Sequence, residues 1–154
     1  MGAVYKINDD FYDDSFLLIA LHSTLEDYAI VYQLNLNLNA KFKRVRSDLD
    51  LGKTRTFPLF EWQDDYNDRY LMLVSNQSTE QEFLPNNDLF QNEPTATTPK
   101  LVPELKDVDY FLKIEEGEAF QNKEILRKVT SMPKIMAAYE VEANKLKSKN
   151  NLIF

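Results

Sequence analysis

The sequence contains no cysteine and only one histidine among its 154 residues. The lack of cysteine excludes a disulfide framework, a zinc site built on thiolates and a cysteine nucleophile. The single histidine, His22, leaves little material for a metal centre or for acid–base catalysis. We therefore expect neither a metal nor a cofactor.

Long apolar runs are lacking too. The longest run, residues 16–21, has only the length of a strand, whereas a membrane-spanning helix needs about 20 residues. The first residues show neither the basic nor the apolar stage of a signal peptide. Basic residues are outnumbered, with 18 Lys and Arg against 25 Asp and Glu and a net charge of −7, which repels nucleic-acid phosphates. These features predict a cytoplasmic protein that binds neither membranes nor nucleic acid.

The apolar material is sufficient for one folded core. Hydrophobic residues make up 44% of the chain and aromatic residues 12%, which is more than a disordered chain carries. The length is that of one domain. We predict a single domain over residues 1–154, with a long irregular connector at 75–107, where four prolines occur, and a C-terminal tail at 145–154.

In the first half, the continuous apolar run at 16–22 (FLLIALH) predicts a strand buried on both faces. Ser23 and Glu26 have the spacing of a capping box, so we expect a helix to begin there and to reach about residue 38. The alternation of Leu and Asn at 34–39 is equally typical of a strand.

Strands are the expected elements on both sides of the connector. Residues 42–51, 57–63 and 70–74 are rich in aromatic and branched side chains and predict a meander. Residues 110–115 alternate as a strand does and end in a turn at Gly117. Residues 119–130 have helical spacing and propensity.

The segment after Pro133 is ambiguous. Residues 135–142 alternate as a strand does, although their Ala and Glu content suits a helix. We predict a strand.

Residues 102–110 (VPELKDVDY) resemble the pattern that names the IPExxxVDY family of small bacterial proteins, with Val102 in place of Ile. Residues 16–35 and 146–154 are similar to that family as well. The resemblance implies a bacterial, cytoplasmic protein, and it carries no known activity.

A second resemblance concerns the fold. Residues 109–141 resemble the strand–helix–strand half of ferredoxin-like regulatory modules such as ACT domains, and this favours a strand after Pro133. Together with residues 16–51 it implies an α+β fold, in which two βαβ halves share one antiparallel sheet, two main helices pack on one face, and additional strands extend the sheet.

Two motifs that suggest chemistry fail on their spacing. Residues 51–54 (LGKT) look like the end of a phosphate-binding loop, but Ser47 stands where that loop needs its first glycine. The acidic clusters at 9–14 and 64–68 lack the alternation and the central glycine of a calcium loop, so we interpret them as solvated turns.

Three groups of residues are candidates for binding, and none is predicted to be catalytic. His22 ends a strand close to Glu26, and Ser23 cannot serve it as a nucleophile, because neighbouring residues on a strand point to opposite faces. Glu104, Asp107, Asp109 and Tyr110 belong to the family pattern and form either an acidic lip or a turn that starts a strand. Lys147, Lys149 and Phe154 lie in a tail that combines basic residues with an apolar end.

Three hypotheses about function follow. The first is a non-enzymatic binding or regulatory module that forms a homodimer. The second is an adaptor that docks its tail into a partner protein, whereas the alternative fates of that tail are packing on its own domain or pairing along a subunit edge. The third is a small enzyme that gathers His22, Glu26 and the acids of residues 104–109 in one pocket.

Overall fold

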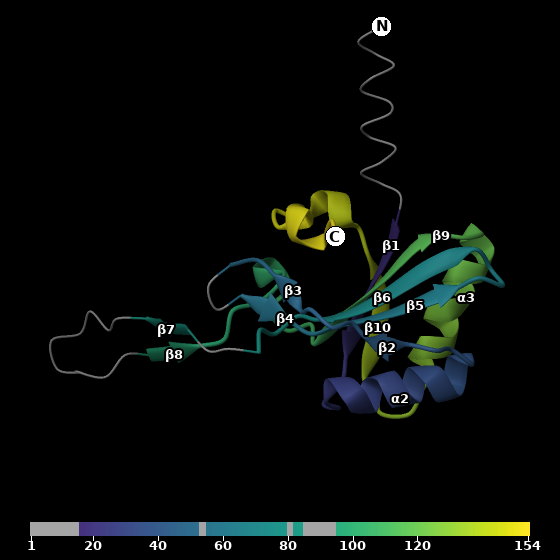
Figure 1. Ribbon diagram of the computed structural model, residues 1–154, viewed down its shortest axis with the longest axis horizontal. Coiled ribbons are helices and arrows are strands. Elements are labelled where there is room, and N and C mark those ends of the chain that lie inside the picture. Colours follow the sequence, from purple (N-terminus) through teal and green to yellow (C-terminus); the bar gives the residue numbers. More distant parts are fainter. Residues whose placement is uncertain (1–15, 53–54, 80–81, 85–94) are drawn as a thin grey trace, which may run out of the picture.

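The computed structural model describes residues 16–52, 55–79, 82–84 and 95–154, and it has an α+β fold (Figure 1). Within these residues, a six-stranded antiparallel sheet is accompanied by two α-helices and two short two-stranded sheets. The strands are β1 (Phe16–His22), β2 (Lys43–Arg44), β3 (Leu49–Asp50), β4 (Thr56–Phe57), β5 (Leu59–Asp64), β6 (Arg69–Ser75), β7 (Glu82–Leu84), β8 (Thr95–Thr97), β9 (Tyr110–Glu116) and β10 (Ala137–Val141). The helices are α2 (Asp27–Leu38) and α3 (Ala119–Thr130), with 3₁₀ turns η1 (Pro103–Leu105), η2 (Ala143–Lys145) and η3 (Lys149–Leu152).

The main sheet has the strand order β10-β1-β9-β6-β5-β2, and every neighbouring pair is antiparallel. β1 lies inside the sheet between β10 and β9, and its residues Leu18, Ile19, Ala20 and Leu21 are all buried. A strand with water on neither face needs apolar side chains in both directions. The continuous run at 16–22 therefore forms the central strand that its pattern predicts.

Both helices cover the same face of the sheet. One buried cluster joins Ile19 and Leu21 of β1 to Ile30 of α2 and to Ile125 and Val129 of α3. In Figure 1, α2 and α3 lie beside each other next to the strands. The predicted arrangement of two helices on one face of an antiparallel sheet is thus present in the structure.

The opposite face is covered by pieces of chain rather than by helices. A second buried cluster includes Leu18 and Phe111 from the sheet and Phe57 from β4. It also contains Val102, which precedes η1, and Leu152 from η3. The tail therefore packs on its own domain, which is one of the three fates predicted for it, and its buried leucine is not exposed to a partner protein.

A buried lysine joins the tail to this second face. Lys113 of β9 is 2% exposed, and its Nζ donates to the main-chain oxygen of Phe154 at 3.2 Å and pairs with Glu115 at 2.9 Å. The rings of Phe16 and Phe154 lie 4.7 and 4.4 Å from the same nitrogen. Burying an ammonium group is costly unless hydrogen bonds, an opposite charge and ring faces replace its water.

The predicted capping box is wrong. The α2 helix begins at Asp27 with Glu26 at its N-cap and no side-chain cap. The Ser23 hydroxyl instead donates to the Lys134 carbonyl at 2.8 Å and accepts the Leu25 amide at 3.2 Å. A tertiary contact across 111 residues therefore takes the oxygen that the local pattern assigned to the helix.

Other boundaries shift as well. Residues 42–51 are not one strand, because they divide into β2 and β3, which belong to different sheets. The connector at 75–107 is not wholly irregular, since β7 pairs with β8 and η1 follows. Residues 137–141 form the strand β10, whereas the acidic cluster at 9–14 and Lys53 and Thr54 of the glycine turn lie outside the described residues.

We expect Leu152→Ala to reduce the free energy of unfolding by about 2–5 kcal/mol, because it opens a cavity beneath a fully buried side chain. Urea unfolding followed by circular dichroism measures the change. The control is Ile153→Ala, which alters the neighbouring side chain, 52% exposed, and should cost less than about 1 kcal/mol. Equal losses in the two variants would contradict packing of the tail on the sheet.

Candidate functional site

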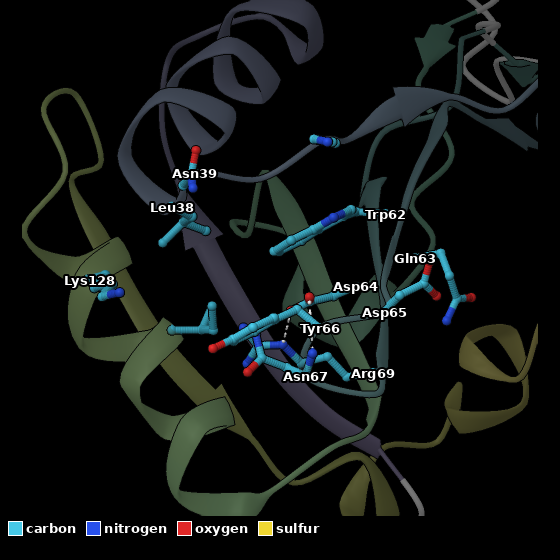
Figure 2. A pocket seen from close by; sticks show the side chains of 12 residues that line it. Leu38, Asn39, Trp62, Gln63, Asp64, Asp65, Tyr66, Asn67, Arg69 and Lys128 are labelled. Atoms are coloured by element: carbon cyan, nitrogen blue, oxygen red, sulfur yellow. Dashed lines mark hydrogen bonds and ion pairs between the residues drawn. The ribbon is translucent and has the colours of Figure 1, made fainter.

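A cavity of about 500 Å³ lies where the hairpin of β5 and β6 meets the two helices (Figure 2). Leu38 and Asn39 line it from the end of α2, and Ile125 and Lys128 line it from α3. The hairpin contributes residues 62–67 and Arg69, which include part of the acidic turn, and Lys41, which lies between α2 and β2, completes the lining. This volume is within the range of small-molecule sites.

A buried ion pair forms the polar wall of the cavity. Arg69 Nε lies 2.7 Å from Asp64 Oδ2, and the two side chains are 7% and 4% exposed. Asn67 donates to the same carboxylate oxygen at 2.9 Å. Burial alone raises the pKa of the Asp64 carboxyl, but the hydrogen bonds from Asn67 and Arg69 outweigh it and hold the pKa below its ordinary value. Asp64 is therefore not the solvated turn residue that the sequence indicated.

The Arg69 guanidinium is only partly used by this network. Its Nη1 donates to the Asn122 side chain at 3.2 Å and to the Gln121 carbonyl at 3.3 Å. Its Nη2 has no hydrogen-bond partner among the residues that the structure describes. Arg69 lines the cavity, so a nearly buried cation brings unused donors to it.

Gly117 makes the burial of this arginine possible. The residue has a φ of +77°, and a Cβ atom built there would lie 2.9 Å from the Cβ of Arg69. Only glycine fits such a close approach without a shift of the backbone. Asn122 completes the arrangement by donating to the Glu116 carbonyl at 2.8 Å.

Two aromatic side chains of the hairpin reach toward the helices. Figure 2 shows the rings of Trp62 and Tyr66 extending from the hairpin in the direction of α2 and α3, whereas Gln63 points away from the helices. Trp62 packs on Phe42, with ring centroids 5.7 Å apart, and the Arg69 guanidinium carbon lies 5.9 Å from the Trp62 ring. Tyr66 is 96% exposed. Together with Leu38 and Ile125 these rings give the cavity an apolar side.

The rim of the cavity is cationic. Lys41 and Lys128 are exposed, line the cavity and form no ion pair within the described part of the chain. With Arg69 they outnumber the two lining carboxylates, of which Asp64 is already paired. A locally cationic cavity on a chain with a net charge of −7 is suited to an anionic ligand.

Part of the sequence-predicted site lies elsewhere, in a smaller cavity of about 360 Å³. His22, Glu104 and Asp107 all line it, so the structure does bring these three together. The His22 Nε2 lies 2.9 Å from the Tyr139 hydroxyl. Glu104 is engaged by Ser148, whose amide donates at 3.0 Å and whose hydroxyl also donates to it. Burial alone raises the pKa of Glu104, but these hydrogen bonds lower it overall.

Other residues of the pattern at 102–110 form hydrogen bonds that hold neighbouring segments of the fold together. Asp109 accepts the Ser23 amide at 2.8 Å, and the Tyr110 hydroxyl donates to the Leu25 carbonyl at 2.7 Å. Both residues line a third cavity, which His22 does not line. Val102 donates its amide to the Asn76 side chain at 2.8 Å. The pattern thus ties the loop after β1 and the end of β6 to the start of β9.

The remaining candidates are scattered. Glu26 is exposed at the start of α2 and lines neither the cavity of His22 nor that of Asp109. Lys147 is exposed, and Lys149 donates to the Asn144 side chain. Phe154 lies over Lys113. The structure therefore divides eight of the nine predicted residues between two cavities and the tail, and Glu26 stands apart at the start of α2.

The cavity of Arg69 is the feature that sequence reasoning missed. The available signal was Trp62 followed by the acidic turn at 64–68 and by an arginine directly after it. The pattern shows these residues to be close in the chain. It does not show that α2 and α3 close a cavity against them, because that depends on the tertiary fold.

Comparisons with known proteins find no relatives. No family model matches the chain, no curated protein matches it, and no solved structure matches it. Among the described residues, no helix has the length and apolar character needed to cross a bilayer. The same residues contain no group of three or more metal-ligating side chains that could hold a metal ion.

We expect Asp64→Asn to lower the free energy of unfolding at pH 7 by about 1.5–3 kcal/mol, because the Arg69 charge loses its buried partner. Since the pKa of Asp64 is lowered in the folded state, its contribution is complete above the pKa of the unfolded chain and disappears as the pH falls through the folded value. Urea unfolding at a series of pH values measures both effects. Asp65→Asn, which changes an exposed carboxylate with no ion pair among the described residues, is the control, and an equal loss there would contradict the role of the pair.

Proposed function

We propose that the protein is a non-enzymatic binding module and that the cavity of Arg69 holds a small organic anion, with a carboxylate or phosphate group joined to an apolar body. The observation that carries this proposal is a buried guanidinium at the wall of the cavity, whose Nη2 has no hydrogen-bond partner in the described part of the chain. Arginine presents its nitrogens as a planar fork that matches a carboxylate or a phosphate.

The rest of the lining supports the same ligand class. Lys41 and Lys128 offer ammonium groups at the rim, and these attract an anion without competing for the buried site. Leu38, Ile125 and Trp62 offer apolar surface, which would exclude water from the body of the ligand. An inorganic anion would contact only the cationic groups and would leave the apolar surface unused.

We also propose two finer assignments. The order β10-β1-β9-β6, with α2 following β1 and α3 joining β9 to β10, supports a ferredoxin-like arrangement that β5 and β2 extend. The contacts of Glu104, Asp109 and Tyr110 give the pattern at 102–110 a structural role, and this supports membership of the IPExxxVDY family. We also propose that the protein resides in the cytoplasm.

Because Trp62 is the single tryptophan of the chain and lines the cavity, its fluorescence reports directly on binding. We expect phenyl phosphate to change the Trp62 emission saturably, with an affinity in the millimolar range that is usual for so small a ligand. Inorganic phosphate should bind at least about fivefold more weakly, since it leaves the apolar wall bare. The neutral analogue benzyl alcohol should bind more weakly still.

A matched pair of variants on α3 completes this experiment. Lys128→Gln should raise the dissociation constant for phenyl phosphate by about three- to tenfold, the usual loss for one exposed charge contact. Lys123→Gln removes a lysine of the same helix that does not line the cavity and should leave the constant unchanged. Equal binding of benzyl alcohol and phenyl phosphate, or an equal effect of both lysine substitutions, would overturn the proposed function.

A further inference from the structure

The outer face of α2 carries a row of large apolar side chains, which we call the α2 stripe. It consists of Tyr28, Tyr32 and Leu36, whose exposed fractions are 67, 64 and 65%. Spacings of four residues place all three on one side of the helix. The opposite side of α2 is used by the core, through Ile30, Leu34 and other buried residues. In Figure 1 the outer side of α2 faces away from the sheet.

This face lacks the charges that a solvated helix normally carries. No charged residue occurs from Tyr28 to Ala40, although charged residues make up 28% of the chain. The neighbouring helix α3 exposes Lys123, Arg127 and Lys128 on its outer side. A surface helix is ordinarily polar on the face opposite the core. α3 follows this rule and α2 does not, so the α2 stripe has the composition of a covered surface.

We infer that a second copy of this chain covers the α2 stripe, with the two α2 helices packed antiparallel about a twofold axis near Tyr32. The stripe is evenly spaced around Tyr32, so the antiparallel arrangement sets Tyr28 against the partner's Leu36, and the reverse contact forms at the same time. A twofold interface requires this self-complementarity. Gln33 and Asn37, which hydrogen-bond to each other at 3.3 Å, would form part of its polar rim.

Charge favours a second copy over a charged partner. Two chains of net charge −7 repel each other. This repulsion is smallest when the two surfaces in contact carry no charge. A strongly basic or acidic partner would find no opposite charge on the three side chains of the stripe, and the carboxylates of Glu26 and Asp27 border it only beside Tyr28. Two copies, in contrast, would each bring the same neutral surface.

The area of the stripe sets the expected strength. Two tyrosines and a leucine that are about two-thirds exposed offer on the order of 400 Å² per copy, so a pair would bury about 800 Å² before its rim is counted. That is below the size of most stable interfaces. We therefore expect a reversible dimer with a dissociation constant in the micromolar range. This inference is independent of the proposed ligand, because the stripe does not line the cavity.

Sedimentation velocity of the full chain, from about 5 to 500 µM, tests for this dimer. Tyr32→Lys should raise the dissociation constant at least about tenfold, because two ammonium groups would meet near the axis. The substitution also makes the chain less acidic, so weaker association could not be blamed on net charge. The control is Phe120→Lys, an equivalent change at a 70% exposed aromatic residue of α3, which should leave the constant unchanged.

A charge swap tests the antiparallel register. Tyr28→Glu and Leu36→Lys should each weaken the dimer, whereas the double variant should restore the dissociation constant to within about threefold of the original, because opposite charges then face each other across the axis. Both changes suit the helix dipole, and an unchanged far-ultraviolet circular dichroism spectrum would verify that α2 still folds.

Three outcomes would overturn the inference. The first is a monomer at every concentration, which is also the result expected if residues 1–15 cover the stripe within one chain. The second is a dimer that is insensitive to Tyr32→Lys. The third is a double variant that associates as weakly as its two single parents.

Discussion

The burial of β1 on both of its faces is the constraint on which the rest of the structure depends. Residues Leu18 to Leu21 alternate between two separate hydrophobic clusters, so neither side of the sheet can be left to water. The α2 and α3 helices cover one side. On the other side, among the residues that the structure describes, β3 and β4, the segment around η1 and the tail provide the cover. Segments from most of the described chain therefore pack on one face or the other of β1.

This constraint explains why two cations are buried. A sheet covered on both faces leaves few places where a charged side chain on an inner strand can reach water, and Lys113 and Arg69 lie on such strands. Lys113 is stabilised by Glu115, by Phe154 and by two ring faces. Arg69 is the first residue of β6, where Asp64 and Asn122 use only part of its guanidinium. The same residue therefore supports the fold and supplies unused donors to a cavity.

The parts of the fold that could be predicted from sequence are those with strong local periodicity. The strand at 16–22 and the helix at 119–130 have the predicted bounds, because hydrophobic spacing and propensity agree in both. The parts that failed depend on distant partners. Ser23 bonds to Lys134 instead of capping α2, and the buried partner of Asp64, Arg69, is held by Gln121 and Asn122 of α3, more than 50 residues along the chain. No window of neighbouring residues contains that information.

Residues 34–39, whose pattern is equally typical of a helix and of a strand, show how a sequence pattern can mislead. At residues 34–39 leucine and asparagine alternate with a period of two, yet the structure has a helix that ends at Leu38. A helix brings Leu34 and Leu38 to the core and turns Leu36 outward, since residues four apart share a face and residues two apart do not. In a helix with only one apolar side, the outward position 36 would carry a charged or polar residue. The alternation that resembles a strand therefore arises because this helix has two apolar sides, of which the sheet and α3 cover one.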